Sequence, residues 1–237
     1  MSEPKVSPID ALPAASRSYG EIGPRSASPH WGMVVDQERC IGCWSCAVIC
    51  KSENDVPLGT WWNRILTQGD ELDQPMEVRG GALEMDWMPL ACQHCENAPC
   101  VKVCPVGATY YRDDGLVMQD NDRCIGCRYC MIACPYGVRT FNWGEPVRPT
   151  AHSTGMIEVR PVGTVEKCTM CVHRLAEDQV PSCVWSCPTG ARVFGDLNDP
   201  ASRVNELIRE REGYELLKEA GTKPSVHYLP PRRKNEL

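Results

Sequence analysis

The residues with the clearest chemistry in this sequence are sixteen cysteines, which fall into four groups and leave none over. Groups one and three have the spacing C-x2-C-x2-C-x3-C, group two has C-x4-C in its middle, and group four has eleven residues between its second and third cysteines. The groups are Cys40, Cys43, Cys46 and Cys50; Cys92, Cys95, Cys100 and Cys104; Cys124, Cys127, Cys130 and Cys134; and Cys168, Cys171, Cys183 and Cys187. Cysteines at this density indicate disulfides, structural zinc or iron–sulfur clusters.

The spacing within the groups favours 4Fe-4S clusters. A loop with cysteines at two-residue intervals can present three thiolates to three corners of a cubane, while the fourth cysteine, in a helix that has just begun, reaches a second cluster. Groups therefore work in pairs, and four groups predict four 4Fe-4S clusters with all sixteen ligand positions filled. Groups two, three and four end in Cys-Pro, as bacterial ferredoxin runs do, whereas group one ends in Cys50-Lys51.

Zinc and disulfides account for this pattern less well. Zinc sites pair two C-x2-C knuckles in one tetrahedron and do not need triple runs that end in Cys-Pro. Cysteines two residues apart pair poorly with one another, so a disulfide framework would leave the repeat unexplained.

Other polar residues lie near the cysteines. His94 and His173 are interpreted as packing or supporting residues, because the local cysteine sets are already complete. Some basic residues beside the ligands could raise a cluster's potential by their charge, with surface solvation as the alternative: Arg39, Lys102, Arg123, Arg128 and Lys167.

The remaining composition limits the function. With 237 residues, 19 Gly, 20 Pro and only 2 Phe, the apolar core is expected to be thin, so the clusters should help to hold the fold. A net charge of -6 and a pI near 5.4 disfavour nucleic acid as the main ligand. Residues 1–32 lack the apolar run and the Arg-Arg pair of an export signal, and no segment approaches the length of a membrane span. Membrane contact is therefore expected only through a partner.

Short strands and helices are expected to position the cluster loops in an α+β fold. Strands are predicted at 32–36, 138–141 and 191–194, a helix at 47–52, and a hairpin at 108–118.

The order of the groups predicts two bacterial-type two-cluster ferredoxin modules, one inserted within the other, with long loop excursions. The outer module carries groups one and four, the inner module carries groups two and three, and Asp199-Pro200 is expected to cap a helix in the tail. The excursions at 53–83 and 145–165 are candidate partner surfaces. The predicted divisions are an extended arm at 1–32, an outer module at 33–83 and 144–198, an inner module at 84–143, and a helical tail at 199–237.

Three segments are similar to a known family: CENAPCVKVCPVGA (95–108), CIGCRYCMIACPYG (124–137) and CVWSCPTGARVFGDLNDP (183–200). From about Gly32 to Leu229 the chain resembles the four-cluster electron-transfer subunits of molybdenum and tungsten bis-pterin oxidoreductases. These include the beta subunits of polysulfide, thiosulfate, tetrathionate, arsenate and dimethyl sulfoxide reductases. The tail segments LNDPASRVNELI and GTKPSVHYLP are most similar to the polysulfide, thiosulfate, tetrathionate and arsenate branch.

The resemblance implies four ligand sets, ordered from the catalytic subunit to the membrane subunit. They are Cys40, Cys43, Cys46 and Cys187; Cys50, Cys168, Cys171 and Cys183; Cys92, Cys95, Cys100 and Cys134; and Cys104, Cys124, Cys127 and Cys130. Because Cys127 is present, no 3Fe-4S centre is expected. The implied role is a non-catalytic relay of single electrons between a large molybdopterin catalytic subunit and an integral membrane, quinone-binding anchor subunit.

This resemblance also implies a location at the cytoplasmic membrane through the partner subunits. The extracytoplasmic face is expected, by co-export with the catalytic subunit, and the cytoplasmic face is the alternative. A formate dehydrogenase or hydrogenase beta subunit is the alternative within electron transfer. A cluster-bearing nucleic-acid-binding protein and a self-sufficient redox enzyme are the alternatives outside it.

Overall fold

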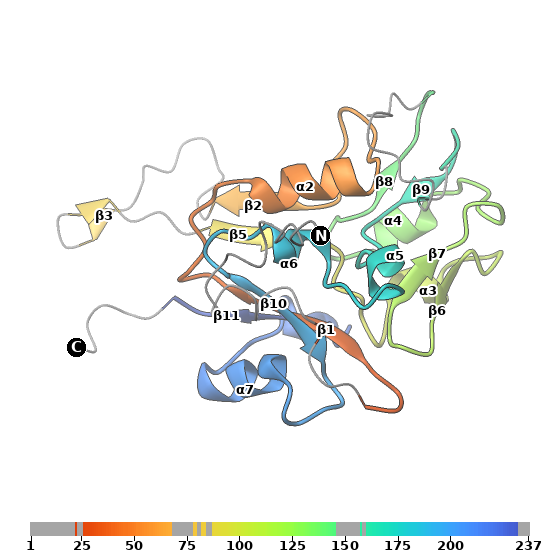
Figure 1. Ribbon diagram of the computed structural model, residues 1–237. Coiled ribbons are helices and arrows are strands. Elements are labelled where there is room, and N and C mark those ends of the chain that lie inside the picture. The colour runs from red at the N-terminus through yellow and green to blue at the C-terminus, as the bar shows by residue number, and fades with distance from the viewer. Residues whose placement is uncertain are drawn as a thin grey trace, which may run out of the picture.

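The computed structural model describes residues 22, 26–67, 78–79, 82–83, 87–145, 157 and 160–231. This part of the chain is an α+β fold of small sheets and short helices (Figure 1). Its elements, in chain order, are β1 (Trp31–Asp36), α2 (Ser45–Glu53), β2 (Arg64–Thr67), β3 (Val78–Arg79), β4 (Ala82–Leu83), β5 (Trp87–Leu90), α3 (Pro99–Lys102), β6 (Thr109–Tyr111), β7 (Val117–Gln119), α4 (Tyr129–Ala133), β8 (Thr140–Phe141), β9 (Val165–Glu166), α5 (Val172–Leu175), α6 (Ser182–Trp185), β10 (Arg192–Asp196), α7 (Arg203–Glu210), a 3₁₀ helix (Lys218–Ala220) and β11 (Val226–Leu229).

The largest described sheet has the strand order β10-β1-β11 and joins three distant parts of the chain. Strand β1 pairs antiparallel with β10, with Met33 opposite Phe194, and parallel with β11, with Met33 opposite Val226. Every residue of β1 is buried, because the sheet is covered on both faces. Figure 1 shows α7 on one face and the helices of the cysteine groups, α2 and α6, on the other.

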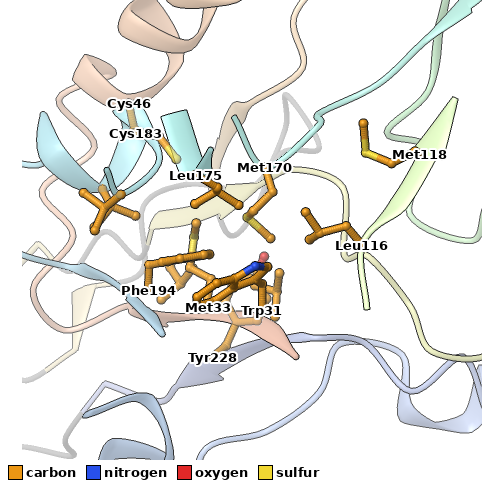
Figure 2. Packing of buried hydrophobic residues seen from close by; sticks show 14 of the residues in the cluster. Trp31, Met33, Cys46, Leu116, Met118, Met170, Leu175, Cys183, Phe194 and Tyr228 are labelled. Atoms are coloured by element: carbon orange, nitrogen blue, oxygen red, sulfur yellow. The ribbon is translucent and has the colours of Figure 1, made fainter. Parts of the chain in front are cut away.

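Alternate residues of β1 enter two different cores, as the period of a strand requires. Trp31, Met33 and Val35 belong to the core on the α2 and α6 side, whereas Val34 packs under α7 with Val204. Figure 2 shows Met33, Trp31, Phe194 and Tyr228 together, with the sulfur atoms of Cys46 and Cys183 near them. The main apolar core therefore extends directly into the cysteine groups.

Most predicted elements are confirmed, with boundaries shifted by a few residues. Strand 32–36 is β1, helix 47–52 is α2, strand 191–194 lies largely within β10, and the hairpin is β6 and β7, with Tyr110 opposite Met118. The prediction of a strand over 138–141 is only partly right. Strand β8 covers Thr140–Phe141, because its partner β9 is equally short.

The tail differs from the prediction in two respects. Helix α7 begins at Arg203 rather than at Pro200, because residues 199–202 form a turn in which the Ser202 N–H donates to the Asp199 carbonyl at 2.9 Å. The Asp199 carboxylate accepts from the Ala201 N–H at 2.9 Å, within the same turn. The tail is also not purely helical, since β11 joins the main sheet. Of the predicted N-terminal arm, only Ile22 and residues 26–32 lie within the described residues.

One tyrosine connects the tail to the segment that precedes group two. The Tyr228 hydroxyl donates to the Pro89 carbonyl at 2.9 Å and accepts from Gln93 Nε2 at 3.3 Å, and the side chain is fully buried. We predict that Tyr228→Phe lowers the free energy of unfolding by about 1–3 kcal/mol, because it leaves the Pro89 carbonyl buried without a donor. Urea titration followed by far-UV circular dichroism measures this change.

Tyr214→Phe is the matched control. The Tyr214 hydroxyl donates to Gln37 Oε1 at 2.6 Å, but both residues are partly exposed, so water can replace the lost bond. Equal losses of stability in the two variants would contradict the buried role of Tyr228.

Candidate iron–sulfur cluster sites

The structure brings together the four cysteines of each predicted set. Three sets line hollows of about 330, 450 and 280 Å³, counting space open to solvent. The first set lines the hollow of about 330 Å³, the second set lines the hollow of about 450 Å³ together with Cys92, and the fourth set lines the hollow of about 280 Å³. In the third set, Cys92, Cys95 and Cys100 are buried in one packed cluster, and Cys134 packs against it. The first set comprises Cys40, Cys43, Cys46 and Cys187; the second comprises Cys50, Cys168, Cys171 and Cys183; the third comprises Cys92, Cys95, Cys100 and Cys134; and the fourth comprises Cys104, Cys124, Cys127 and Cys130.

The loops of groups one and three have the same local backbone conformation. Gly42 and Trp44 in one loop, and Gly126 and Arg128 in the other, have φ values of 65°, 62°, 68° and 61°. Left-handed residues between right-handed ones turn successive N–H groups toward one side, which creates a concave site for anions. The two loops can therefore surround negatively charged sulfur in the same way.

Backbone N–H groups donate to several of the sulfur atoms. The Ala191 N–H lies 3.2 Å from Cys187 Sγ, and the Met170 N–H lies 3.3 Å from Cys168 Sγ. Backbone donors near Thr109 outweigh partial burial and lower the pKa of Cys104. Such bonds stabilise sulfur in its anionic form, which is the form that ligates metal.

In the second set, burial outweighs the stabilisation that such donors give to the anionic form of sulfur. Burial raises the pKa of Cys183 to about 12, and burial together with the neighbouring cysteines raises the pKa of Cys50 and of Cys168. Cys92 is different: burial opposes ionisation, but the positive charge of Lys167 lowers its pKa to about 5. Several buried thiols crowded together are unfavourable as thiolates unless bound metal neutralises them, so the donor set suits a metal cluster.

Two buried donors beside the third set also fit a 4Fe-4S cluster. Arg139 Nη2 and His94 Nε2 make no hydrogen bond of normal geometry within the described residues. His94 Nδ1 accepts from the Val117 N–H at 3.2 Å, so its hydrogen is on Nε2. Arg139 lies beside Cys100, and His94 lies beside Cys92, so both donors adjoin the third set. The anionic sulfur of a cluster would satisfy them.

A single metal ion does not fit as well. In the described part of the chain, no three His, Cys, Asp or Glu side chains are arranged to hold one ion. A zinc tetrahedron needs its ligands about 2–2.3 Å from one centre, whereas a cubane holds its cysteines farther apart.

The other polar residues that lie near the cysteines in the sequence differ in their contacts and in their exposure to solvent. His173 Nε2 hydrogen-bonds to Glu53 Oε1 at 2.9 Å and does not face a cysteine set. Of the basic residues beside the ligands, Lys167 is 2% exposed, whereas the others are exposed on the surface: Arg39, Lys102, Arg123 and Arg128.

Sequence reasoning missed two buried cations, Arg139 and Arg192. Both stand five residues after a Cys-Pro cysteine, in CPYGVRTF (134–141) and CPTGARVF (187–194). This repeated arginine was the signal that could have identified them.

The comparisons with known proteins agree with this geometry. Models described as 4Fe-4S dicluster domains match residues 83–149 and 156–197, and residues 39–108, and together these ranges include all sixteen cysteines. The site and the fold thus define a ferredoxin-type protein whose cysteines fit four 4Fe-4S clusters.

Similar proteins narrow the class to a family. The iron-sulfur subunit of a putative dimethyl sulfoxide reductase from Halobacterium salinarum is 55% identical over 206 residues, covering 84% of this chain and 79% of that protein. A subunit of the tetrathionate reductase of Salmonella typhimurium is 42% identical over 201 residues, covering 84% and 72%. The arsenate respiratory reductase iron-sulfur subunit of Shewanella is 38% identical over 231 residues, covering 84% and 95%. The chain belongs to this family of reductase iron–sulfur subunits, which confirms the resemblance found in the sequence.

The shared glycine of the two loops provides a test of loop packing. A Cβ at Gly126 would lie 2.2 Å from the Gly163 carbonyl oxygen, whereas a Cβ at Gly137 would meet nothing within 4 Å. Both glycines have positive φ, so alanine is strained at either position. We predict that Gly126→Ala costs about 1–3 kcal/mol more than Gly137→Ala, because it also forces the backbone of residue 163 to move.

Urea titration of the two glycine variants measures this difference, and iron analysis reports the state of the fourth set. Similar midpoints and similar iron contents would show that Gly126 is not held against Gly163.

Proposed function

We propose that this chain relays single electrons through four 4Fe-4S clusters between a molybdenum bis-pterin catalytic subunit and a quinone-reactive membrane anchor subunit. A bound 4Fe-4S cluster supplies the capacity to hold and release one electron. The protein residues fix the order, spacing and surroundings of the clusters. In this role the chain is non-catalytic, and its cysteines are ligands in the four sets defined above.

The observation that carries the proposal is the order of the sets in space. Cysteines of successive sets lie in the same packed clusters or hollows. Cys46 of the first set and Cys183 of the second share one core, Cys92 of the third lines the hollow of the second set with Cys168, and Cys100 of the third shares a core with Cys130 of the fourth. The sets therefore form a continuous series rather than separate sites, as an electron relay requires.

The same geometry supports nested modules. Helix α2, which carries the last two cysteines of group one, packs on α6 of group four, and β1 pairs with β10, so elements on both sides of residues 84–143 come together. Within that range α3 packs on α4 and on β6. Two strand pairs, β2 with β5 and β8 with β9, connect the proposed modules, because each has one strand in either module. The predicted excursions at 53–83 and 145–165 lie partly outside the described residues.

Exposed apolar side chains beside the two outer sets support a partner at each end. Ile41 and Val48, near the first set, are 58% and 57% exposed. Ile125 and Ile132, near the fourth set, are 63% and 83% exposed. Contiguous exposed apolar surface is typical of protein interfaces. No helix in the described ranges is long and apolar enough to cross a bilayer.

The family resemblance implies that the catalytic partner binds at the end with the first set and the membrane anchor at the end with the fourth set. The chain would then lie at the cytoplasmic membrane through its partners, on the extracytoplasmic face if it is exported with the catalytic subunit. Its relatives in Halobacterium, Shewanella and Salmonella are named as parts of reductases, which does not favour a formate dehydrogenase or hydrogenase beta subunit.

Cluster content and ligand sets can be tested together on anaerobically purified protein. About sixteen irons and no stoichiometric zinc are expected per chain. We predict that Cys43→Ser and Cys187→Ser remove the same electron paramagnetic resonance signal, because both residues line the first hollow. Cys50→Ser should remove a different signal, although Cys50 is closer in sequence to Cys43. Loss of one common signal in Cys50→Ser and Cys187→Ser would contradict the proposed sets.

The two proposed interfaces can be tested with equivalent helix residues. Val48 stands two residues after Cys46 in α2, and Ile132 stands two residues after Cys130 in α4. We predict that Val48→Asp weakens co-purification of the catalytic subunit and that Ile132→Asp weakens co-purification of the anchor subunit, each by about tenfold, because a charge is buried at an interface. Each variant is the control for the other. Unchanged subunit composition in both, at full iron content, would contradict the assignment of the ends.

A further inference from the structure

A buried arginine separates the first cysteine set from the second. Arg192 is 3% exposed and lines both hollows. Its Nη1 lies 3.8 Å from Cys183 Sγ, and its Nη2 donates to Asn63 Oδ1 at 2.8 Å. Its charge also interacts with Cys46, so the guanidinium lies near sulfur atoms of both sets.

A second arginine is in the equivalent position between the third set and the fourth. Arg139 is 5% exposed, and its guanidinium interacts with Cys100 of the third set and Cys130 of the fourth. Its Nη1 donates to Gln119 Oε1 at 3.0 Å and to Thr109 Oγ1 at 3.3 Å. An amide oxygen thus holds each arginine: Asn63 holds Arg192, and Gln119 holds Arg139.

The equivalence of the two arginines follows from the sequence repeat. In CPYGVR and CPTGAR the glycine has φ of 58° at Gly137 and 61° at Gly190, so the chain turns in the same way before each arginine. The remaining Cys-Pro run, CPVGAT, has Thr109 at the arginine position, and Thr109 accepts from Arg139. Each proposed module therefore places an arginine between its own two cysteine sets.

Lys167 occupies the middle gap, between the second set and the third. Its Nζ donates to the Cys168 carbonyl at 2.8 Å and to the Val117 carbonyl, and the residue is 2% exposed. Its charge interacts with Cys92, the third-set cysteine that also lines the second hollow. Each gap in the series thus contains a buried cation.

We propose that Arg192, Lys167 and Arg139 set the reduction potentials of the clusters on either side of their gaps, and that the exposed basic residues beside the ligands do not. This inference rests on the proposed relay function. A one-electron transfer oxidises one cluster and reduces the next, with no atom transferred. A cation buried between them favours the reduced state of both, because a buried charge is weakly screened, while an exposed charge is screened by water and salt.

A position between two clusters has a further consequence. A cation close to only one cluster would make that cluster an electron trap, since it would stabilise the electron on one side of the step. A cation shared by both raises both potentials, so the free-energy difference across the step stays small. The expected role is therefore to raise the potential of the whole series without interrupting it.

Isosteric variants beside the arginines test this proposal without removing a buried side chain. Asn63→Asp adds a negative charge 2.8 Å from Arg192, and Gln119→Glu adds one 3.0 Å from Arg139. The adjacent guanidinium keeps each new carboxylate ionised. The matched controls are Asn97→Asp and Gln179→Glu, which make the same chemical changes at exposed positions between cysteines.

The measurement is a redox titration of the holoprotein, followed by electron paramagnetic resonance, with iron analysis of each sample. Asn63→Asp should decrease the equilibrium constant for one-electron reduction of the first two clusters by about tenfold, a shift of about 59 mV. Gln119→Glu should do the same for the third and fourth clusters. Each variant should leave the other pair unchanged, and the exposed controls should shift no potential by as much.

Arg192→Gln and Arg139→Gln provide a second set of variants, with Arg192→Lys and Arg139→Lys retaining the charge. Full iron content with unchanged potentials in the aspartate, glutamate and glutamine variants would overturn the proposal. Loss of clusters in all four of those variants would show that the residues are structural supports, which would also overturn it. A wild-type protein with far fewer than about sixteen irons would instead contradict the proposed function itself.

Discussion

Negative charge on buried sulfur is the constraint on which the rest of this structure depends. Sixteen cysteines are concentrated in a chain with few large apolar residues, and many of their sulfur atoms are withdrawn from water. Thiolates in a low-dielectric interior are unfavourable unless cations, N–H donors or metal compensate them. The left-handed residues of the loops, the N–H donors to Cys168 and Cys187, and the buried arginines all contribute this compensation. The local conformations follow from the electrostatics of the sites.

The apolar core has a different task, which is to bring distant cysteine groups together. Strand β1 precedes group one and β10 follows group four, and their antiparallel pairing brings the first and the last cysteine groups together. Trp31 stacks on Phe194 diagonally across this strand pair, at 5.2 Å between ring centroids. The same core includes Cys46 and Cys183, so sulfur ligands and aromatic side chains belong to one packed unit. We therefore expect ligation by these cysteines to be coupled to folding, as in other small metal-containing domains.

Cysteine spacing predicted much of this site because the requirement is local. Three thiolates in a loop, a closing cysteine in a short helix and the hairpin after group two all depend on residues close in sequence. The pairing of β8 with β9 and the place of β11 beside β1 depend on contacts between segments far apart, and no local pattern marks them. Arg139 and Arg192 are marked by a local repeat, but their importance arises only when the fold brings sulfur atoms of two groups to each guanidinium, which the sequence does not show. Lys167 was named as a candidate only because it adjoins a ligand cysteine in the sequence. The residues around it do not show that it is buried, whereas Arg123, which also adjoins a cysteine, is exposed.

The departure of group one from the Cys-Pro pattern has a structural reason. In group three the helix α4 ends at Ala133, before Cys134-Pro135, because proline cannot continue it. Lysine in place of proline lets α2 continue past Cys50 to Glu53, and Lys51 Nζ donates to the Pro57 and Thr60 carbonyls at 2.6 and 2.7 Å. The longer helix brings Asn54 Nδ2 to 3.7 Å from Cys50 Sγ and 3.6 Å from Cys171 Sγ. An amide donor thus reaches two buried sulfur atoms of the second set, so the missing proline adds a donor where water cannot supply one.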